Sequence, residues 1–395
     1  MKKIILVVII LELGIISTPF TLKNNVVMAA NGNTSNNTNE IINAQEDNLK
    51  IGDFINEAQK YTKESMPDID LNNLLSTAIS GKIDNSIFLK IFWKLLGNEF
   101  VTSIKTLTSI IVVVVIHSIL KAISDGLSNK GVSQVTYYVE YIIIVTIIMS
   151  NFAEVITMVK SSVKSLIAFI NLLIPILTTL MMATGGVTSA SLLEPLIIFM
   201  TTFVGNFIVN IILPIVLAST ALGIISQISD KVQVNNLSKL MKTSCVWVLA
   251  IILTLFVGIT SLESTLSSSV DGVSAKTAKA AVSNFIPVVG KILGDAVDTV
   301  MGCSIILKNA IGIVGVIVII SICLVPILKL TVLMAMYYLT SAVCQPVADA
   351  KIINLFKHMG ETFKILLAIL CSISAMLIIG VTIIIKMSNS GIMMV

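Results

Sequence analysis

Residues 165–229 read SLIAFINLLIPILTTLMMATGGVTSASLLEPLIIFMTTFVGNFIVNIILPIVLASTALGIISQIS, and Glu194 is the only charged residue among them. A helix of about 20 apolar residues is long enough to cross the roughly 30 Å hydrocarbon core of a bilayer. Further uncharged runs occupy residues 243–262, 309–328, 330–348 and 365–385. A water-soluble protein of this length could not bury so many such runs. The sequence therefore predicts an all-α, polytopic membrane protein whose few intramembrane polar groups are candidates for function.

The composition agrees with a membrane protein and argues against several other classes. Hydrophobic residues make up 55% of the chain and charged residues 12%, whereas soluble domains contain about 25% charged residues. All 26 basic residues are lysines, so arginine clamps are excluded. A net charge of +4 spread over membrane flanks does not indicate nucleic-acid binding. The five cysteines lie in or beside apolar runs without CxxC spacing, which is typical of small core residues.

The catalytic motifs that would indicate an enzyme are missing from the sequence. No P-loop pattern appears, so we do not expect this chain to hydrolyse ATP. The HExxH pattern is also missing, and the two histidines, His117 and His358, are far apart, which argues against a metalloprotease site. We therefore expect a non-enzymatic protein that holds no cofactor and no metal.

Residues 1–30 have the pattern of a secretory signal peptide. Two lysines precede an apolar run over residues 4–16, and small residues follow at Ala29 and Ala30. A basic start, a short apolar core and small residues near the cleavage point are typical of such signals. We expect cleavage after Ala29 or Ala30. An uncleaved first anchor is the alternative, and Glu12 inside the apolar run weakens the signal core.

A cleaved signal peptide places residues 31–100 outside the cytoplasm. Residues 31–40 are polar and predict a disordered linker. Apolar periodicity predicts an amphipathic helix over residues 71–79, with Pro67-Asp68 as its start signal. A second apolar stripe over residues 88–96 contains Trp93 between lysines. This stripe fits either an interfacial helix or a surface that packs against a partner or the bundle.

Residues 101–395 form the predicted transmembrane bundle of seven to eight helices. The expected spans lie near residues 104–124, 137–158, 165–184, 196–220, 243–262, 309–328, 330–348 and 365–385. Residues 195–229 are too long for one straight span and too short for two, so Pro214 predicts a kinked or broken helix. Lysines in short loops favour the cytoplasmic side. The expected loop with Lys239 and Lys242 falls on the other side, against this rule.

The first concentration of polar residues inside the apolar runs follows Pro175. Its hydroxyl and small residues, among them Gly185 and Gly186, are typical of close helix packing. Glu194 is costly in lipid, so it should face protein or water. One interpretation is a polar-path or contact residue. The other is an interfacial glutamate just before a helix, stabilised by the positive end of the helix dipole.

The second concentration lies near residues 275–308, which are too polar to span the bilayer comfortably. We expect an amphipathic or re-entrant segment that leads into the following span. Gly290 and Gly294 are four residues apart and predict a helix-packing surface. Lys291, Asp295, Asp298 and Lys308 are candidate polar-path or contact residues. Solvated charges on the polar face of a helix are an equally good interpretation of the two aspartates.

Several longer strings resemble the stage III sporulation protein AE family of endospore-forming Firmicutes over essentially the whole chain. The strings occupy residues 173–175, 184–190, 285–290, 298–300 and 307–315. The resemblance implies a multi-pass protein of the mother-cell membrane around the forespore. It also implies membership of a secretion-like complex that joins the two cells, with other membrane and intermembrane subunits and a separate ATPase as partners. The family supplies no catalytic residues.

Two functional hypotheses follow. The first is a non-enzymatic membrane subunit of the mother cell–forespore channel complex, which is needed for forespore development. The second is a stand-alone permease for a small solute that uses Glu194, Asp295 or Asp298 as coupling acids. A permease would transport its solute alone in liposomes, whereas a channel subunit would not.

Overall fold

The computed structural model of the protein is helical almost throughout the part of the chain that it describes. That part comprises residues 35–63, 66, 69–80, 93–104, 108, 111–112, 114–116, 119, 130–228, 234–285, 289–346 and 348–390. These residues include no strand. The predicted signal peptide and most of the expected span 104–124 lie outside the described residues. The linker expected over residues 31–40 already gives way to a helix at Ser35.

Within the described residues, the short helices α2–α4 and the helical residues 93–104 precede a bundle of long helices. The short helices are α2 (Ser35–Asn48), α3 (Ile51–Thr62) and α4 (Leu71–Ile79). The long ones are α6 (Lys130–Ala183), α7 (Val187–Phe207), the π-helical segment η1 (Ile208–Ile212), α8 (Leu213–Ile228), α9 (Asn235–Phe285), α10 (Val289–Val343) and α11 (Ala350–Ser390). Because α7, η1 and α8 follow one another without a gap, the described part of the bundle consists of five long rods.

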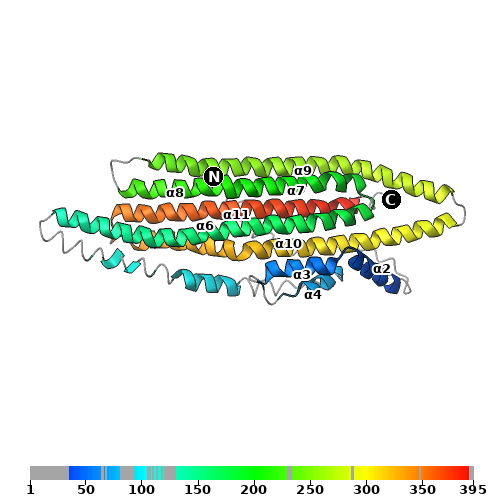
Figure 1. Ribbon diagram of the computed structural model, residues 1–395, viewed down its shortest axis with the longest axis horizontal. Helices are drawn as coiled ribbons and strands as arrows, with labels where there is room; N and C mark the ends of the chain where they lie inside the picture. Colours follow the sequence, from blue (N-terminus) through cyan, green and yellow to red (C-terminus); the bar gives the residue numbers. More distant parts are fainter. Residues whose placement is uncertain are drawn as a thin grey trace.

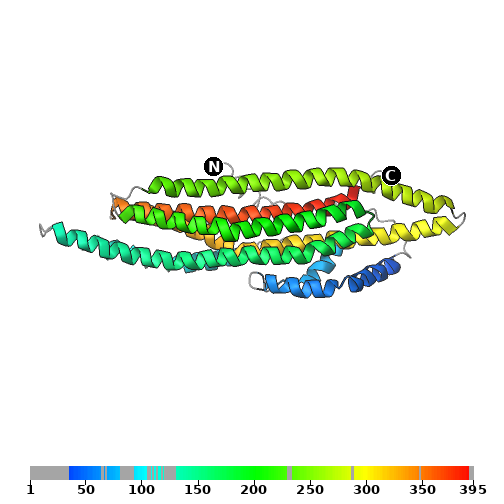
Figure 2. The same cartoon turned by 45° about the horizontal axis from the view of Figure 1, so that its top comes forward.

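The five rods lie side by side and alternate in direction along the chain (Figure 1). Helix α11 is central, because it packs against α6, α7, α8, α9 and α10. Helix α9 forms one long edge, and α2–α4 lie at the opposite side of the molecule in both views (Figure 2). In the most apolar window of each helix, 78% of the residues of α10 and of α11 are buried, but only 22% of those of α9. The outer surface of α9 therefore remains available to lipid or protein.

The described part of the chain contains five helices that are long and apolar enough to cross a membrane, and the predicted seven to eight spans are not confirmed. The five are Tyr141–Ala183, Val187–Gln227, Asn235–Asp271, Thr299–Val343 and Ala350–Met387. Two pairs of expected spans are each part of one continuous helix: 137–158 with 165–184 in α6, and 309–328 with 330–348 in α10. At 1.5 Å per residue, each helix is longer than one perpendicular crossing requires.

The sequence-based prediction divided α6 and α10 into too many spans because lysines lie between the apolar runs. Lys160 and Lys164 suggested a loop between two spans, yet both lie on the exposed face of α6 while Val159 and Val163 beside them are buried. Lys329 lies in the middle of α10 and is paired with Glu154 of α6. A lysine has a long apolar stem and can reach a polar region from the side of a helix. A single lysine therefore does not mark the end of a helix in this protein.

The helix around Pro214 is locally wound into a π-helix rather than broken. Proline lacks the N–H that would bond to the carbonyl four residues earlier. Directly before it, the N–H of Leu213 bonds to the carbonyl of Ile208, five residues back, and residues 208–212 form η1. A π-bulge is one of the few recognised causes of a local change in helix direction. The predicted irregularity at Pro214 is therefore present, but the helix continues through it.

Helices α2–α4 pack along α10 and α6. The Phe54 and Tyr61 rings of α3 lie 6.1 and 5.8 Å from the ring of Phe169 in α6. The predicted helix over residues 71–79 is confirmed as α4, although its N-cap is Asp70, whose carboxylate accepts the N–H of Asn72 at 3.0 Å. The outer face of α3 carries the exposed Asp53 and Lys60. This side of the bundle therefore presents polar groups.

Candidate functional site: polar contacts inside an apolar bundle

The glycine-rich segment after α6 forms a tight turn between α6 and α7. Gly185 has a φ of 89°, which lies in the left-handed region that favours glycine. The N–H groups of Gly185 and Gly186 bond to the carbonyls of Met182 and Met181 at 3.0 Å each. This pattern is a Schellman motif, which satisfies carbonyls at the end of a helix. These two glycines, which we had predicted to pack helices together, instead reverse the direction of the chain.

A carboxylate from another helix caps the start of α7. The residue before α7 is Gly186, which has no side chain to cap the first N–H groups. Asp271 of α9 accepts the N–H of Thr188 with one oxygen and that of Ser189 with the other, both at 2.9 Å. Asp271 is only 8% exposed. A negative charge at a helix N-terminus is also favoured by the helix dipole. Asp271 thus joins α9 to the α6–α7 turn.

Glu194 lies inside α7, not just before a helix, because α7 begins at Val187. Its Oε2 accepts a hydrogen bond from the Thr178 hydroxyl of α6 at 2.7 Å. Thr178 is fully buried, and its hydroxyl also contacts the carbonyls of Ile174 and Pro175 at 3.1 Å. Glu194 of α7 therefore contacts α6 through Thr178.

Lys308 is the candidate that the structure places deepest in the bundle. Its side chain is completely buried, and its ammonium donates to the carbonyls of Ile384 and Ile385 in α11 at 3.2 Å. These carbonyls lie toward the C-terminal end of α11, where the helix dipole favours a positive charge. The contact fixes α10 relative to α11. Lys308 is thus a contact residue between the two most buried helices.

A second buried lysine, which the sequence analysis had assigned to a loop, joins α9 to α11. Lys242 is 4% exposed and lies within α9. Its ammonium donates to the Thr362 hydroxyl at 2.7 Å and to the His358 carbonyl at 3.3 Å, and it lies 3.2–3.3 Å from both ring nitrogens of His358. Helix α8 closes the cluster, because a methyl group added at Gly223 would overlap the His358 ring. Three helices therefore meet at one buried lysine.

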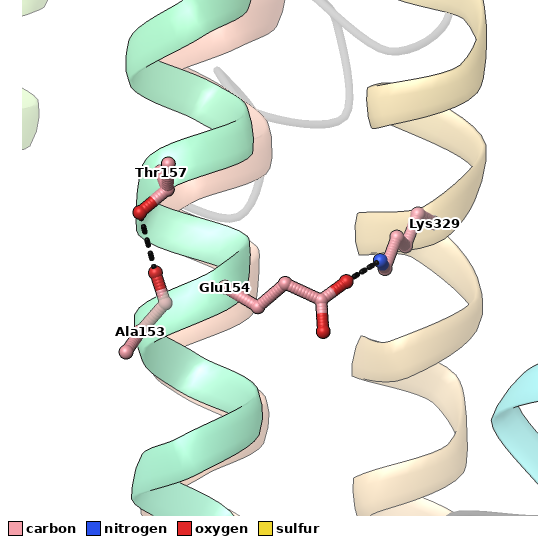
Figure 3. Close-up of polar contacts among 4 residues, drawn as sticks. All are labelled: Ala153, Glu154, Thr157 and Lys329. Atoms are coloured by element: carbon pink, nitrogen blue, oxygen red, sulfur yellow. Dashed lines mark hydrogen bonds and ion pairs between the residues drawn. The ribbon is translucent and has the colours of Figure 1, made fainter.

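A partly exposed ion pair links α6 to α10. Lys329 Nζ lies 2.7 Å from Glu154 Oε1, and the two side chains are 25% and 69% exposed. Figure 3 shows Glu154 extending from α6 across to Lys329, one turn before Thr157, which bonds to the carbonyl of Ala153 in its own helix. The charges of Lys329 and Glu154 both act on the nearby Glu99. Burial raises its pKa, Lys329 partly offsets that effect, and Glu154 adds to it.

The remaining predicted site residues can be placed on the backbone only. Lys291, Asp295 and Asp298 lie in the first turns of α10, but their side chains are outside the described residues. Gly290 and Gly294 lie in the same helix. Residues 289–308 are continuous with the rest of α10, and α9 and α10 meet beyond the end of the other rods (Figure 1). Among the described residues, no group of three His, Cys, Asp or Glu residues is arranged to hold a metal ion.

Sequence reasoning missed Asp271, Lys242 and His358. A lone acid in a serine-rich stretch was a weak signal for Asp271, and nothing in the sequence indicated which helix it caps. Lys242 stands at the edge of an uncharged run and therefore looked like a loop lysine. His358 entered the sequence analysis only as one of two histidines that lie far apart in the chain. In each case the partner is far away in the sequence, and only the packing of the helices brings the groups together.

Comparison with known proteins identifies the family. The model of stage III sporulation protein AE matches residues 69–388, which is most of the chain and includes all five long rods except the last two residues of α11. The chain belongs to this family. It is 30% identical to the stage III sporulation protein AE of Bacillus subtilis (strain 168) over 212 residues, which are 54% of this chain and 53% of the relative. The aligned part thus spans about half the length of the curated relative. No solved structure matches the chain.

Proposed function

We propose that the chain is a non-enzymatic integral membrane subunit of a secretion-like channel complex between mother cell and forespore. Membership of a sporulation protein family supports a role in sporulation, and five long apolar helices support a location in a membrane. Under this proposal the chain lies in the mother-cell membrane that surrounds the forespore. Its partners are the lipid bilayer, further membrane and intermembrane subunits, and a separate ATPase, because the sequence has no P-loop.

The observation that most favours a subunit over a permease is the pairing of the buried polar groups. Lys308, Lys242 and Asp271 each bond to a neighbouring helix and so hold the rods together. Glu194, one of the proposed coupling acids, accepts a hydrogen bond from Thr178. A coupling acid has to exchange a proton or ion with water, whereas these groups bond to protein. This arrangement fits a scaffold of fixed rods.

Reconstitution tests this proposal directly. The purified chain in liposomes should transport no small solute above the level of empty liposomes. In sporulating host cells, an affinity-tagged copy should co-purify with other membrane subunits and with an ATPase, and deletion should arrest forespore development. Transport by the chain alone, lost on Glu194→Gln or Asp298→Asn, would establish the permease hypothesis instead. Leu192→Ala, an exposed apolar change on α7, is the control variant for both assays.

A further inference from the structure

The outer face of α7 combines aromatic and polar side chains in an unusual way. Phe199, Phe203 and Phe207 stack along the helix, with ring centroids 6.0 and 6.2 Å apart and interplanar angles of 17° and 21°. Beside this ladder, Thr202, Asn206 and Asn210 repeat every four residues and so follow one another along the helix. The two rows line an open groove, which we call the α7 groove.

The α7 groove faces away from the bundle. Phe199 is 64% and Phe203 52% exposed, and both asparagines are exposed. On the opposite side of the helix, Gly205 touches Ile167 of α6 so closely that an added methyl group would overlap it. The groove therefore lies on the side of α7 that no other described helix covers. It reaches η1, where the π-helical winding places Asn210.

The asparagines are poorly suited to an ordinary lipid-facing surface. The groove is in the middle of an uncharged run of more than 30 residues, where a carboxamide without a hydrogen bond is unfavourable. Within the described part of the chain, no hydrogen bond to the side chain of Asn206 or Asn210 is found. An acyl chain offers neither donor nor acceptor. The occupant must therefore carry polar groups within the apolar layer, as one transmembrane helix does for another.

We propose that a second copy of this chain packs on the α7 groove, with Asn206 and Asn210 of the two copies hydrogen-bonded to each other. A carboxamide is both donor and acceptor, so asparagine is complementary to itself. Two copies inserted in the same orientation are related by a two-fold axis along the membrane normal. Each residue then meets its own counterpart at the same depth in the membrane. A second copy therefore presents one amide at the depth of Asn206 and another at the depth of Asn210. The groove has no charged residue, so the contact involves no like-charge repulsion.

Site-specific photo-crosslinking in native membranes tests this inference. Benzoylphenylalanine replaces Phe203 in one copy, while a second copy carries a different tag. The control position is Trp247, which is an equally exposed aromatic residue on α9 (62%). We expect a product of twice the chain mass with both tags from position 203 and none from position 247. Equal products from both positions, no product, or a product that joins the chain only to another protein would overturn the proposal.

A second pair of variants tests the asparagines themselves. Asn206→Leu combined with Asn210→Leu should abolish the crosslink from position 203, because leucine keeps the apolar surface and removes both amides. Thr254→Leu, an exposed polar residue on α9 that bonds only within its own helix, should leave the crosslink intact. Equal membrane levels of all variants show that insertion is unaffected. A crosslink that survives the double change would overturn the asparagine contact. The inference does not depend on the proposed function, since a dimeric permease would give the same products.

Discussion

At the scale of single residues, the bundle is held by a few buried polar groups whose partners come from distant helices. Lys308 was among the candidate polar-path or contact residues named from the sequence. Its acceptors were not, since two backbone carbonyls of α11 leave no trace in the sequence. The same holds for Lys242, which we had assigned to a loop and whose neighbours His358 and Thr362 come from a distant part of the chain. The sequence thus shows which polar residues lie in or beside the apolar runs, but the groups that they contact depend on how the helices pack.

Gly223 provides a sharp test of the contact between α8 and α11. In Gly223→Ala the new methyl group would overlap the His358 ring, and overpacking of this kind typically destabilises by about 1–3 kcal/mol. Gly258→Ala is the matched control, because nothing lies within 4 Å of the added group. Alanine there should stabilise the helix by up to about 1 kcal/mol. Thermal unfolding in detergent measures both, and equal melting temperatures would contradict the packing of Gly223 on His358.

Asp271 is predicted to stabilise the start of α7. Asp271→Ala removes the acceptor of two backbone N–H groups, and loss of an N-cap costs about 0.5–2 kcal/mol. Asp271→Asn keeps one acceptor oxygen and should lose less. Glu263→Ala, an acid in the same helix with no described contact to α7, is the control. Thermal unfolding of the three variants should rank Asp271→Ala lowest. A wild-type melting temperature for that variant would show that α7 needs no cap from α9.

At the scale of helices, the sequence predicted the class of every long element but not its length. The predicted helix 71–79 and the spans in α9 and α11 agree with the structure, because apolar periodicity and uncharged runs depend on local sequence. The predicted division of α6 and of α10 into two spans each does not agree with the structure, because the expected spans were separated at Lys160 and Lys329. A charged group is compatible with a long helix when it is exposed or paired. Whether a lysine is exposed or paired depends on the neighbouring helices, so it could not be predicted from the sequence.

The ion pair between α6 and α10 is predicted to contribute little to stability. Glu154 is 69% exposed, and exposed pairs are typically worth about 0–1 kcal/mol because water screens them and two long side chains lose freedom. A double-mutant cycle with Glu154→Gln and Lys329→Gln should give a coupling energy below about 1 kcal/mol and almost none at high salt. A coupling of several kcal/mol that persists in salt would mean that the pair is shielded from water in the assembled state.

At the scale of the whole molecule, the described structure has two sides of different character. Helices α2–α4 cover one side and present polar groups such as Asp53, while α7 and α9 present apolar residues on the other, among them Phe203 and Trp247. The sequence left open whether the apolar stripe over residues 88–96 meets lipid or protein, and most of that stripe lies outside the described residues. In the structure, α3 and α4 pack on the bundle. The sequence could not predict this packing, because the surface that receives α3, around Phe169, is assembled from α6 and α10.

This division predicts that α2–α4 can be detached without unfolding the rods. Phe54→Ala removes a ring that lies against Phe169, and truncating a buried phenylalanine typically costs about 3–5 kcal/mol. That cost falls on a small unit of three short helices, whereas the contacts among α6, α10 and α11 are unchanged. Hydrogen exchange should therefore accelerate in α3 and α4 but remain slow in α11, and Asp53→Ala, an exposed neighbour, should change neither. If exchange accelerates equally in α3 and α11, the short helices and the rods unfold as one cooperative unit. The N-terminal segment would then be part of the core of the bundle rather than a cover on one of its sides.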